Sequence, residues 1–185
     1  GDMFMHSDAK QLIASQLFTM LEHKKIEDIT VKSLVDACQI SRQTFYYHFQ
    51  DIIAVLEWGT RKAVDQALKD AMMTQDPREA VSIFVLRILD NKEISKKLLQ
   101  SQRRFELEQI LIDAFHIYLQ ELFRQKWPNP SLSVSDINEL LDFYTYGLVG
   151  LILMHCTQKT SDPELLSDQL YRILSGKMQK DLFCE

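Results

Sequence analysis

The segment from Ile40 to Phe49 places hydrogen-bonding side chains and aromatic rings at the spacing of a short helix. Ser41 is a good N-cap, because its hydroxyl can accept a hydrogen bond from the amide three residues on. The helix is therefore expected to begin at Arg42. At about 100° per residue, Phe45 and Phe49 lie close together on one side of it. These two rings predict the side that anchors the helix to a core.

The opposite side of this helix carries groups that can contact a nucleic acid. Five side chains there or at its flanks can donate or accept hydrogen bonds: Arg42, Gln43, Thr44, Tyr47 and His48. Arg can bond the two acceptors of guanine, Gln can pair with adenine, and the methyl group of Thr can pack on thymine. A place in the core is the alternative for aromatic residues in a short helix, and it is expected for Tyr46.

A second short helix precedes this one and is expected to hold it at a fixed angle. Thr30 is another N-cap, and apolar residues follow it at i, i+3, i+4 and i+7. These residues are Val31, Leu34, Val35 and Cys38. Lys32 and Ser33 lie on the polar side, and only residues 38–40 connect the two helices. This arrangement is typical of a helix-turn-helix, whose second helix enters the major groove of DNA.

Residues from about Leu12 to Leu68 resemble the N-terminal domain of the tetracycline-repressor (TetR) family of transcriptional regulators. The resemblance rests on an ordered set that an acidic residue and a long helix follow: Phe18, Ile29-Thr30-Val31, Leu34, Ile40-Ser41 and Thr44-Phe45-Tyr46-Tyr47-His48-Phe49. It implies an all-α fold with about nine helices. Residues 1–50 would form a three-helix DNA-binding head, and residues 51–185 a helical-bundle body for sensing and dimerisation.

The resemblance also implies which residues contact DNA. They are Thr30, Lys32, Ser33, Arg42, Gln43, Thr44, Tyr47 and His48. Lys32, Arg42, Gln43 and Thr44 match base-contacting positions. Tyr47 and His48 match positions that touch the backbone. Thr30 matches a position where a hydroxyl and a helix N-terminal amide hold a phosphate.

Two positions depart from the family pattern. Ile52 stands where many members carry a lysine that meets a phosphate, so one charge contact is missing there. Gln39 stands in the turn where many members have glycine. If Gln39 adopts a positive φ, the strain is on the order of 1 kcal/mol.

Length and charge agree with a compact DNA-binding protein of modest charge. A chain of 185 residues that is 46% hydrophobic can bury roughly 70% of its unfolded surface. Its formal net charge is −5, and residues 1–62 hold seven Lys or Arg against eight Asp or Glu. Because the head is near neutral, affinity must depend on where its cations lie and on a dimer that doubles them. Steep salt dependence is expected.

Other classes of protein find little support. Three cysteines without CxxC spacing indicate neither a disulfide framework nor a zinc site, and no metal or cofactor is expected. A glycine-rich phosphate loop, HExxH and a nucleophile elbow are all missing from the sequence, so it is not expected to be an enzyme. No signal peptide opens the chain, and the uncharged run 143–154 is shorter than the ~20 residues that span a bilayer. We therefore expect a cytoplasmic protein without a membrane segment.

Helical periodicity recurs along the whole chain, and caps and prolines set the expected boundaries. The expected helices are Ser7–Glu22, the pair described above, one capped by Asp51 that runs to Met73, one that starts at Asp76-Pro77, Ser95–Gln100, Arg104–Lys126, one capped by Ser135 that runs to Cys156, and one that opens at Asp162-Pro163 and ends before Gly176. The loop 127–130, with two prolines, would end the seventh helix.

The last two helices offer a wide apolar surface for a dimer. The residues expected at the interface are Leu140, Tyr144, Gly147, Leu148, Leu151, Leu166, Leu170 and Ile173. Gly147 and Gly150 would let a neighbouring helix approach closely. From the residue pattern alone the same side chains could equally close the core of a monomer. The family resemblance favours the dimer, which would place two reading helices about one turn of DNA apart.

A sensing site is expected in the body, lined by aromatic residues with a few polar groups. The candidate lining residues are Phe105, Phe115, His116, Tyr118, Phe143 and Tyr146. A core role is the alternative for each. The chain is thus interpreted as a dimeric regulator, more often a repressor, that binds a palindromic DNA operator and responds to an unknown effector. The string Arg42–Phe49 is also similar to the subgroup that activates dihydroxyacetone-kinase operons through a partner protein, which would make the effector a protein.

Overall fold

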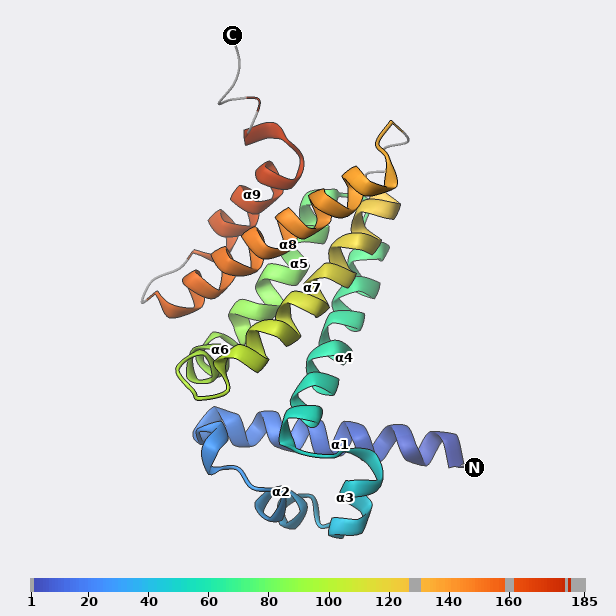
Figure 1. The fold of residues 1–185 in the computed structure, drawn as a ribbon, viewed down its shortest axis with the longest axis vertical. Helices are drawn as coiled ribbons and strands as arrows, with labels where there is room; N and C mark the ends of the chain where they lie inside the picture. Colours follow the sequence, from blue (N-terminus) through green and yellow to red (C-terminus); the bar gives the residue numbers. More distant parts are fainter. Residues whose placement is uncertain (1, 127–130, 159–161, 179, 181–185) are drawn as a thin grey trace. The chain divides into compact units, whose positions relative to one another are not determined.

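The computed structural model describes residues 2–126, 131–158, 162–178 and 180. Every regular element within those residues is helical, which confirms the predicted all-α fold (Figure 1). The elements are α1 (Asp2–His23), the short 3-10 helix η1 (Ile26–Asp28), α2 (Val31–Cys38), α3 (Arg42–His48), α4 (Ile52–Met73), α5 (Pro77–Asp90), α6 (Lys92–Leu99), α7 (Arg104–Lys126), α8 (Val134–Thr157) and α9 (Pro163–Leu174). The predicted loop 127–130 lies outside the described residues.

Most helix starts follow from local capping. The side chains of Thr30, Ser41, Asp76 and Asp162 accept hydrogen bonds from the first-turn amides of α2, α3, α5 and α9, as predicted. The amide of Ala54 donates to the Asp51 carboxylate at 2.8 Å at the start of α4. Each cap satisfies an amide that has no partner inside its helix.

Three predicted starts were wrong. The cap of α8 is Ser133, not Ser135, because Ser133 and Asp136 bond each other's amides in a capping box. Helix α6 begins at Lys92, directly after Asn91, the C-cap of α5. Helix α1 begins at Asp2, since neither Gly nor Pro interrupts the residues before Ser7.

The chain divides into two compact units. The head unit comprises residues 1–63 together with 93–110, and the body unit comprises residues 64–92 together with 111–185. Helix α6 and the first turns of α7 therefore belong to the same unit as α1 to α3. The functional boundary at residue 50 stays a prediction.

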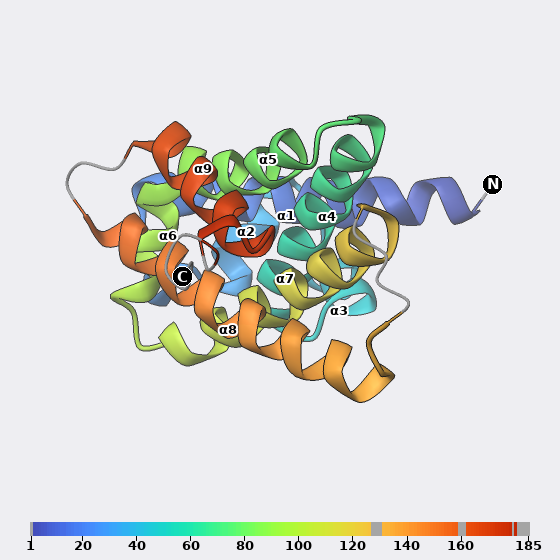
Figure 2. The same cartoon turned by 90° about the horizontal axis from the view of Figure 1, so that it is seen from above.

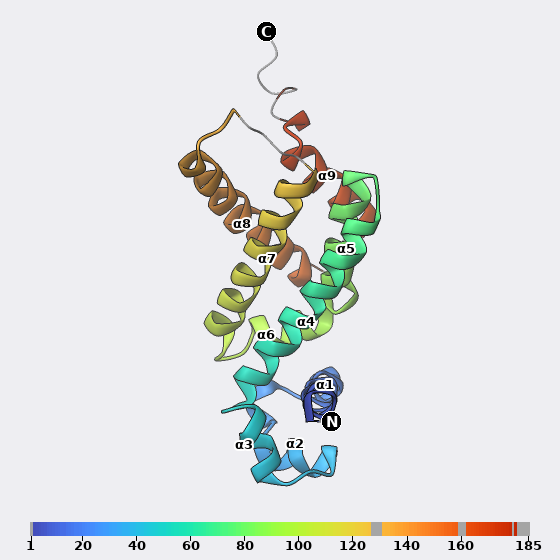
Figure 3. The same cartoon turned by 90° about the vertical axis from the view of Figure 1, so that its right-hand side faces the viewer.

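The core of the head unit lies where α1 meets α2 and α3, on the same side of α1 (Figure 3). Its fully buried side chains are Ile13, Leu17, Leu21, Leu34 and Phe45. Helix α4 closes on α1 at Gly59, where an added Cβ would meet the Phe18 ring at 2.5 Å. This close approach fixes the first turns of α4 against α1, and with them the end of α3.

The body unit packs α5 against α9, which lie side by side in Figure 2, and α5 also contacts α8. Its buried side chains come from all these helices and from α7: Ala80, Phe84, Tyr118, Leu122, Leu148, Ile152, Leu166 and Leu170. The Tyr118 hydroxyl donates to the Ala80 carbonyl at 2.5 Å. That bond satisfies the polar end of a ring that is otherwise surrounded by apolar groups.

Helix α8 is the one described helix long and apolar enough, by length and composition, to cross a membrane. Only 33% of its most apolar window is buried inside the fold. Length and composition do not separate a membrane span from a helix that packs against another protein surface. The exposed residues of α8 therefore have to be considered individually.

Candidate nucleic-acid interface

Helix α3 is short, and its first turn is fixed by two hydroxyls. The Ser41 Oγ accepts from the Thr44 amide at 3.0 Å and lies 2.9 Å from the Thr44 Oγ1. One of the two hydroxyl protons lies in the hydrogen bond between Ser41 and Thr44, and the other can be donated to an outside acceptor. The N-terminal turn of α3 is therefore ordered before any ligand binds.

Two rings anchor α3 to the head unit, as predicted. Phe45 is 0% exposed and Phe49 is 6% exposed, and their centroids lie 6.1 Å apart. Phe49 also meets the Trp58 ring on α4 edge-on, again at 6.1 Å. Because both rings lie on the side of α3 that faces the core, the side chains on the other side of α3 face away from the core together.

The outer side of α3 is polar and aromatic. Arg42, Gln43 and Tyr47 are exposed, the last by 70%, whereas Thr44 and His48 are half-buried. The predicted direction of these side chains is confirmed, although their contact with DNA stays a prediction. Together they offer several hydrogen-bonding groups and one permanent positive charge, that of Arg42, along one side of the helix.

Tyr46 was expected in the core and is instead 58% exposed. It follows Phe45 by about 100° around the helix, so its ring meets the edge of Phe45 at 5.4 Å and then extends into solvent. The sequence pattern predicted a buried Tyr46 because the aromatic character of the side chain was given more weight than its angle around the helix. The hydroxyl of Tyr46 adds a further hydrogen-bonding group beside Tyr47.

Helix α2 presents its N-terminus through a reciprocal cap. The Thr30 Oγ1 accepts from the Ser33 amide at 3.1 Å, and the Ser33 Oγ accepts from the Thr30 amide at 3.0 Å and donates to the Thr30 carbonyl at 2.9 Å. The Ser33 hydroxyl has thus already donated its proton, while the Thr30 hydroxyl acts only as an acceptor here. Of the two predicted contacts, Thr30 is the better placed to donate to a phosphate, and Lys32 beside it is exposed.

The turn between α2 and α3 depends on one residue in the left-handed region. Gln39 has φ 55° and ψ 40°, which confirms the conformation that the family's glycine would favour. Its amide donates to the Asp36 carbonyl at 3.2 Å, and the Ile40 amide donates to Val35 at 3.1 Å. These bonds end α2 and direct the chain into α3 at a strain of about 1 kcal/mol.

The thiol beside this turn has no sign of reactivity. Cys38 is 8% exposed, and burial raises the pKa of its thiol. A neutral, buried thiol acts as a small apolar side chain and not as a nucleophile.

Helix α6 and the segment that follows it are hydrogen-bonded to the C-terminal end of α1 and to η1. The Gln102 amide donates to the Glu27 Oε1 at 2.8 Å, and Lys97 Nζ donates to the carbonyls of Leu21, at 3.1 Å, and Glu22. Hydrogen bonds from backbone amides, its own and that of Gln102, lower the pKa of the Glu27 carboxyl. These contacts explain why α6 belongs to the head unit.

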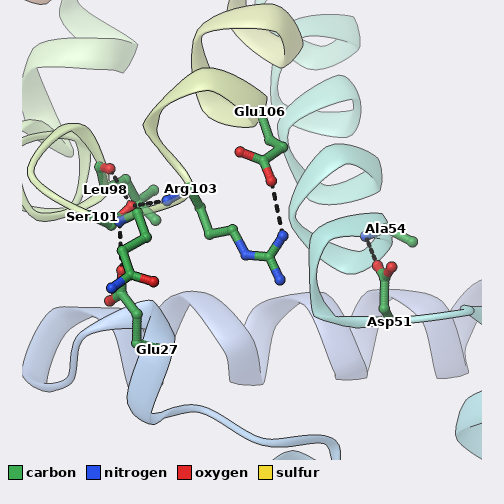
Figure 4. A network of polar contacts seen from close by, with 8 residues as sticks. Glu27, Asp51, Ala54, Leu98, Ser101, Arg103 and Glu106 are labelled. Carbon is green, nitrogen blue, oxygen red and sulfur yellow. Dashed lines mark hydrogen bonds and ion pairs between the residues drawn. The ribbon is translucent and has the colours of Figure 1, made fainter.

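Figure 4 shows the charged groups around this connection. The Arg103 guanidinium bonds the Glu106 carboxylate at 2.8 Å, which raises the pKa of Arg103 and lowers that of Glu106. Asp51 and Glu27 also attract Arg103 at longer range, although Asp51 itself caps α4. Arg103, the residue before α7, is therefore attracted both to η1 and to the residue that caps α4.

The predicted ligand-binding residues are not all brought together. Phe115 and Tyr118 are buried and border an apolar cavity of about 10 Å³, roughly the space of one water molecule. His116 is half-buried and lies 3.4 Å from the Asp142 carboxylate. Phe143 and Tyr146 are instead 71% and 61% exposed on α8. Phe105 is 70% exposed and belongs to the head unit.

The predicted interface residues divide into three groups. Leu148, Leu166 and Leu170 are each at most 2% exposed, because they fill the core of the body unit where α8 and α9 pack. Their assignment to a surface between subunits was wrong. The half-buried members are Tyr144, Leu151 and Ile173, and the exposed members are Leu140 and Gly147.

A different stripe of α8 is open to solvent. Its residues recur at helical spacing and are Leu140, Phe143, Tyr146, Gly147, Gly150 and Met154, which we call the α8 stripe. A Cβ added to Gly147 or Gly150 would meet nothing within 4 Å. The two glycines therefore leave open space between larger apolar side chains on the described surface of α8.

Comparison with known proteins decides the family. Residues 75–176, more than half of the chain, match the TetR-type family model described as "Transcriptional regulator C-terminal region". The chain belongs to the TetR family. This match covers most of the body unit, whereas the resemblance read from the sequence covers the head, so the two findings are independent.

Solved structures of TetR-family regulators share the fold over nearly the whole chain. The structure is similar to "Dihydroxyacetone kinase operon activator DhaS", with 16% identity, a TM-score of 0.69 and coverage of 92% of this chain and 96% of that one. It is similar to the TetR family repressor AlkX from Dietzia sp. strain DQ12-45-1b, with 14% identity, a TM-score of 0.60 and coverage of 92% and 95%.

A TetR-family transcriptional regulator from Syntrophomonas wolfei has 14% identity, a TM-score of 0.59 and coverage of 97% and 99%. Comparison with curated proteins gave no match. At these identities the likenesses show the fold of the TetR-family chain and not its operator or effector.

Proposed function

We propose that this TetR-family chain is a sequence-specific DNA-binding repressor of the cytoplasm. One observation carries the proposal: α3 holds Arg42, Gln43 and Tyr47 in solvent while Phe45 and Phe49 fix its other side in the core. A preorganised row of hydrogen-bonding groups on a short helix suits the major groove. Tyr46 joins the predicted contacts, and Thr30 and Lys32 would meet the backbone from the N-terminus of α2.

The regulator would act as a homodimer that binds a palindromic operator. The α8 stripe supports this, because its apolar residues and two bare glycines have the composition of a helix that packs closely on a copy of itself. Leu165, 54% exposed on α9, extends the surface that a second subunit would cover. Two heads on one duplex would offset the near-neutral charge of each.

An effector in the body would shift the equilibrium between spacings of the two heads, with α4 as the connection. Regulation requires the effector to bind the two states with affinities that differ by about 10- to 100-fold, or about 1.4 to 2.7 kcal/mol. The predicted pocket residues Phe115 and Tyr118 would have to move apart to admit a small molecule, because their cavity has room for about one water.

The second candidate is a transcriptional activator or interaction module controlled by a partner protein. It is favoured by the small size of the cavity that Phe115 and Tyr118 line and by the exposure of Phe143 and Tyr146 on α8. DhaS, which has the same fold, is named an operon activator. In this case the effector would cover a surface instead of filling a cavity.

The deciding experiment is selection of DNA from a random-sequence duplex library by the purified protein. Recovered sequences would be measured by fluorescence anisotropy at two salt concentrations, and the protein mass by light scattering. A palindromic site bound far above random DNA, by a particle of about twice the 21.7 kDa chain mass, supports the proposed regulator. Failure to enrich any sequence at moderate salt contradicts it and favours the interaction module.

A further inference from the structure

A lysine from α1 lies at the C-terminal end of α3. The Lys10 Nζ is 5.5 Å from the centroid of the Phe49 ring, the residue that caps α3. Lys10 is half-buried, so part of its side chain is held by neighbours while the ammonium rests over the ring. An ammonium over a ring face is attracted by the electron density there, and this restricts its position.

A second lysine in the head unit has the same kind of partner. The Lys62 Nζ lies 5.6 Å from the centroid of the Trp58 ring on α4. Since Phe49 and Trp58 touch edge-on, the two lysines and the two rings form one continuous cluster. Lys62, however, is about 15 Å along α4 from its first residue, so only Lys10 lies beside the reading helix.

The position of Lys10 matters because a helix C-terminus repels anions. The last carbonyls of α3 carry a partial negative charge, and Asp51 follows them with a full one. A phosphate could approach this end only if a cation were present. Lys10 supplies a cation next to the Phe49 cap, whereas the N-terminal end of α3 already has Arg42 and the positive end of the helix dipole.

Dimensions place both ends of α3 near the walls of a major groove. A helix of seven residues is about 10 Å long, and the major groove is about 12 Å wide. A reading helix that lies in the groove therefore brings its ends close to the sugar-phosphate backbones on either side. Arg42 or the cap of α3 can serve one wall, and Lys10 can serve the other.

We propose that Lys10 is a DNA-phosphate-binding residue, which the Phe49 ring and the end of α3 hold ready against the backbone beside the groove. The proposal rests on the proposed DNA-binding function. It assigns to α1, outside the helix-turn-helix itself, a charge contact that does not depend on base sequence. It also gives the near-neutral head a preplaced cation, so little side-chain freedom is lost on binding.

The test is the salt dependence of binding to a fluorescein-labelled duplex selected from a random library by the unmodified protein. Lys10→Met keeps the unbranched apolar stem and removes the charge. The slope of log affinity against log salt should become shallower by about 0.9 for each head, or about 1.8 for a dimer. Lys10→Arg should restore the original slope. The ratio of specific to random-duplex binding should change little, because the lost contact is to phosphate.

Lys62→Met is the matched control, since it also removes an ammonium from a ring face in the same cluster. It should leave the salt slope unchanged. An equal slope for Lys10→Met and the unmodified protein would overturn the proposal, and so would an equal loss for both lysine variants, which would indicate a general charge effect. Thermal unfolding of each variant, with Lys10→Gln as a second neutral replacement, separates charge loss from misfolding.

Failure of the two proposals looks different in the same experiment. If the unmodified protein enriches no sequence and binds random duplex without salt dependence, both the regulator and the Lys10 contact are wrong. If the unmodified protein binds a selected site and Lys10→Met keeps its full slope, the regulator stands and the Lys10 contact is wrong.

Discussion

Helices α3 and α8 both expose aromatic rings, but the neighbours of those rings differ. On α3, Tyr46 and Tyr47 stand beside exposed Arg and Gln side chains. On α8, Phe143 and Tyr146 stand beside leucine, methionine and two glycines at which an added Cβ would meet nothing within 4 Å. Exposure of an aromatic ring is therefore not enough to assign a partner.

The difference follows from what each partner gives up on binding. A nucleic acid releases counterions and water only when cations and hydrogen-bonding groups replace them. A protein helix gains from close apolar contact, which glycines make possible by letting backbones approach. The first set of neighbours fits DNA, and the second fits a copy of the chain. The first two predictions below each change one side of this comparison, and the last two change the head unit alone.

The largest effect is expected from the double variant Arg42→Ala, Tyr47→Ala on α3. Loss of one base contact and one backbone contact in each subunit should weaken specific DNA binding by about 100-fold or more, since each contact is worth about 1–3 kcal/mol. The particle mass should stay that of a dimer. Anisotropy with the selected duplex and light scattering measure the two quantities. Intact specific binding would show that α3 is not the reading helix, and Arg124→Ala on α7 is the control.

A large residue in the α8 stripe should instead weaken the dimer. Gly147→Leu meets no obstacle within the subunit, so each subunit should remain folded, and its helix should be favoured by up to about 1 kcal/mol. A close-packed interface would be forced apart, and the dissociation constant of the dimer should rise by about tenfold or more. Sedimentation across protein concentrations measures this change. Asn138→Leu, exposed elsewhere on α8, should leave the mass unchanged.

A smaller effect is expected in the turn that sets the angle of α3. Gln39→Gly should relieve the strain at φ 55° and raise the free energy of unfolding by about 0.5–1 kcal/mol, without altering the dimer. Urea denaturation followed by circular dichroism measures it. Gln100→Gly is the control, because Gln100 does not have a positive φ, and that change should instead destabilise the chain. A loss of stability in Gln39→Gly would mean that the turn is not strained.

The smallest effect concerns pH at Glu27. Hydrogen bonds from backbone amides hold the pKa of this carboxyl below its ordinary value of 4.5, so the folded state favours the ionised form. Its stabilising contribution is complete above pH 4.5 and is lost as the pH falls through the lower native value. The protection of the Gln102 amide against hydrogen exchange, relative to an unstructured amide at the same pH, should decrease over that range. Glu27→Gln, which does not titrate, should abolish this pH-dependent loss of protection, while the α8 stripe stays unaffected.

Local chemistry explains which parts of the fold could be predicted. The caps Thr30, Ser41, Asp76 and Asp162 act on amides two or three residues away, so the sequence contains the whole interaction. Ser135 failed as a cap because Ser133 has the same local pattern and adds the reciprocal bond with Asp136. Where two serines compete, the pattern alone cannot rank them.

Packing between segments far apart in the sequence explains the features that could not be predicted. The period of α8 marks Leu148 and Phe143 equally as apolar, and only the helices that cover one of them decide which is core. Likewise, nothing near Lys10 in the sequence indicates that it would lie over Phe49, nor does anything near Glu27 point to Gln102. These contacts depend on how segments far apart in the sequence pack against one another. The periodicity of a single sequence carries no information about that packing.

The head unit is discontinuous in sequence, and this has a consequence for synthesis on the ribosome. Residues 1–63 emerge first, but their unit is complete only when residues 93–110 have followed. The α8 stripe emerges later still, and at roughly 5–20 residues per second the delay is on the order of several seconds. A nascent chain can therefore finish the surface proposed to contact DNA while the surface proposed to join it to a second copy has yet to be made.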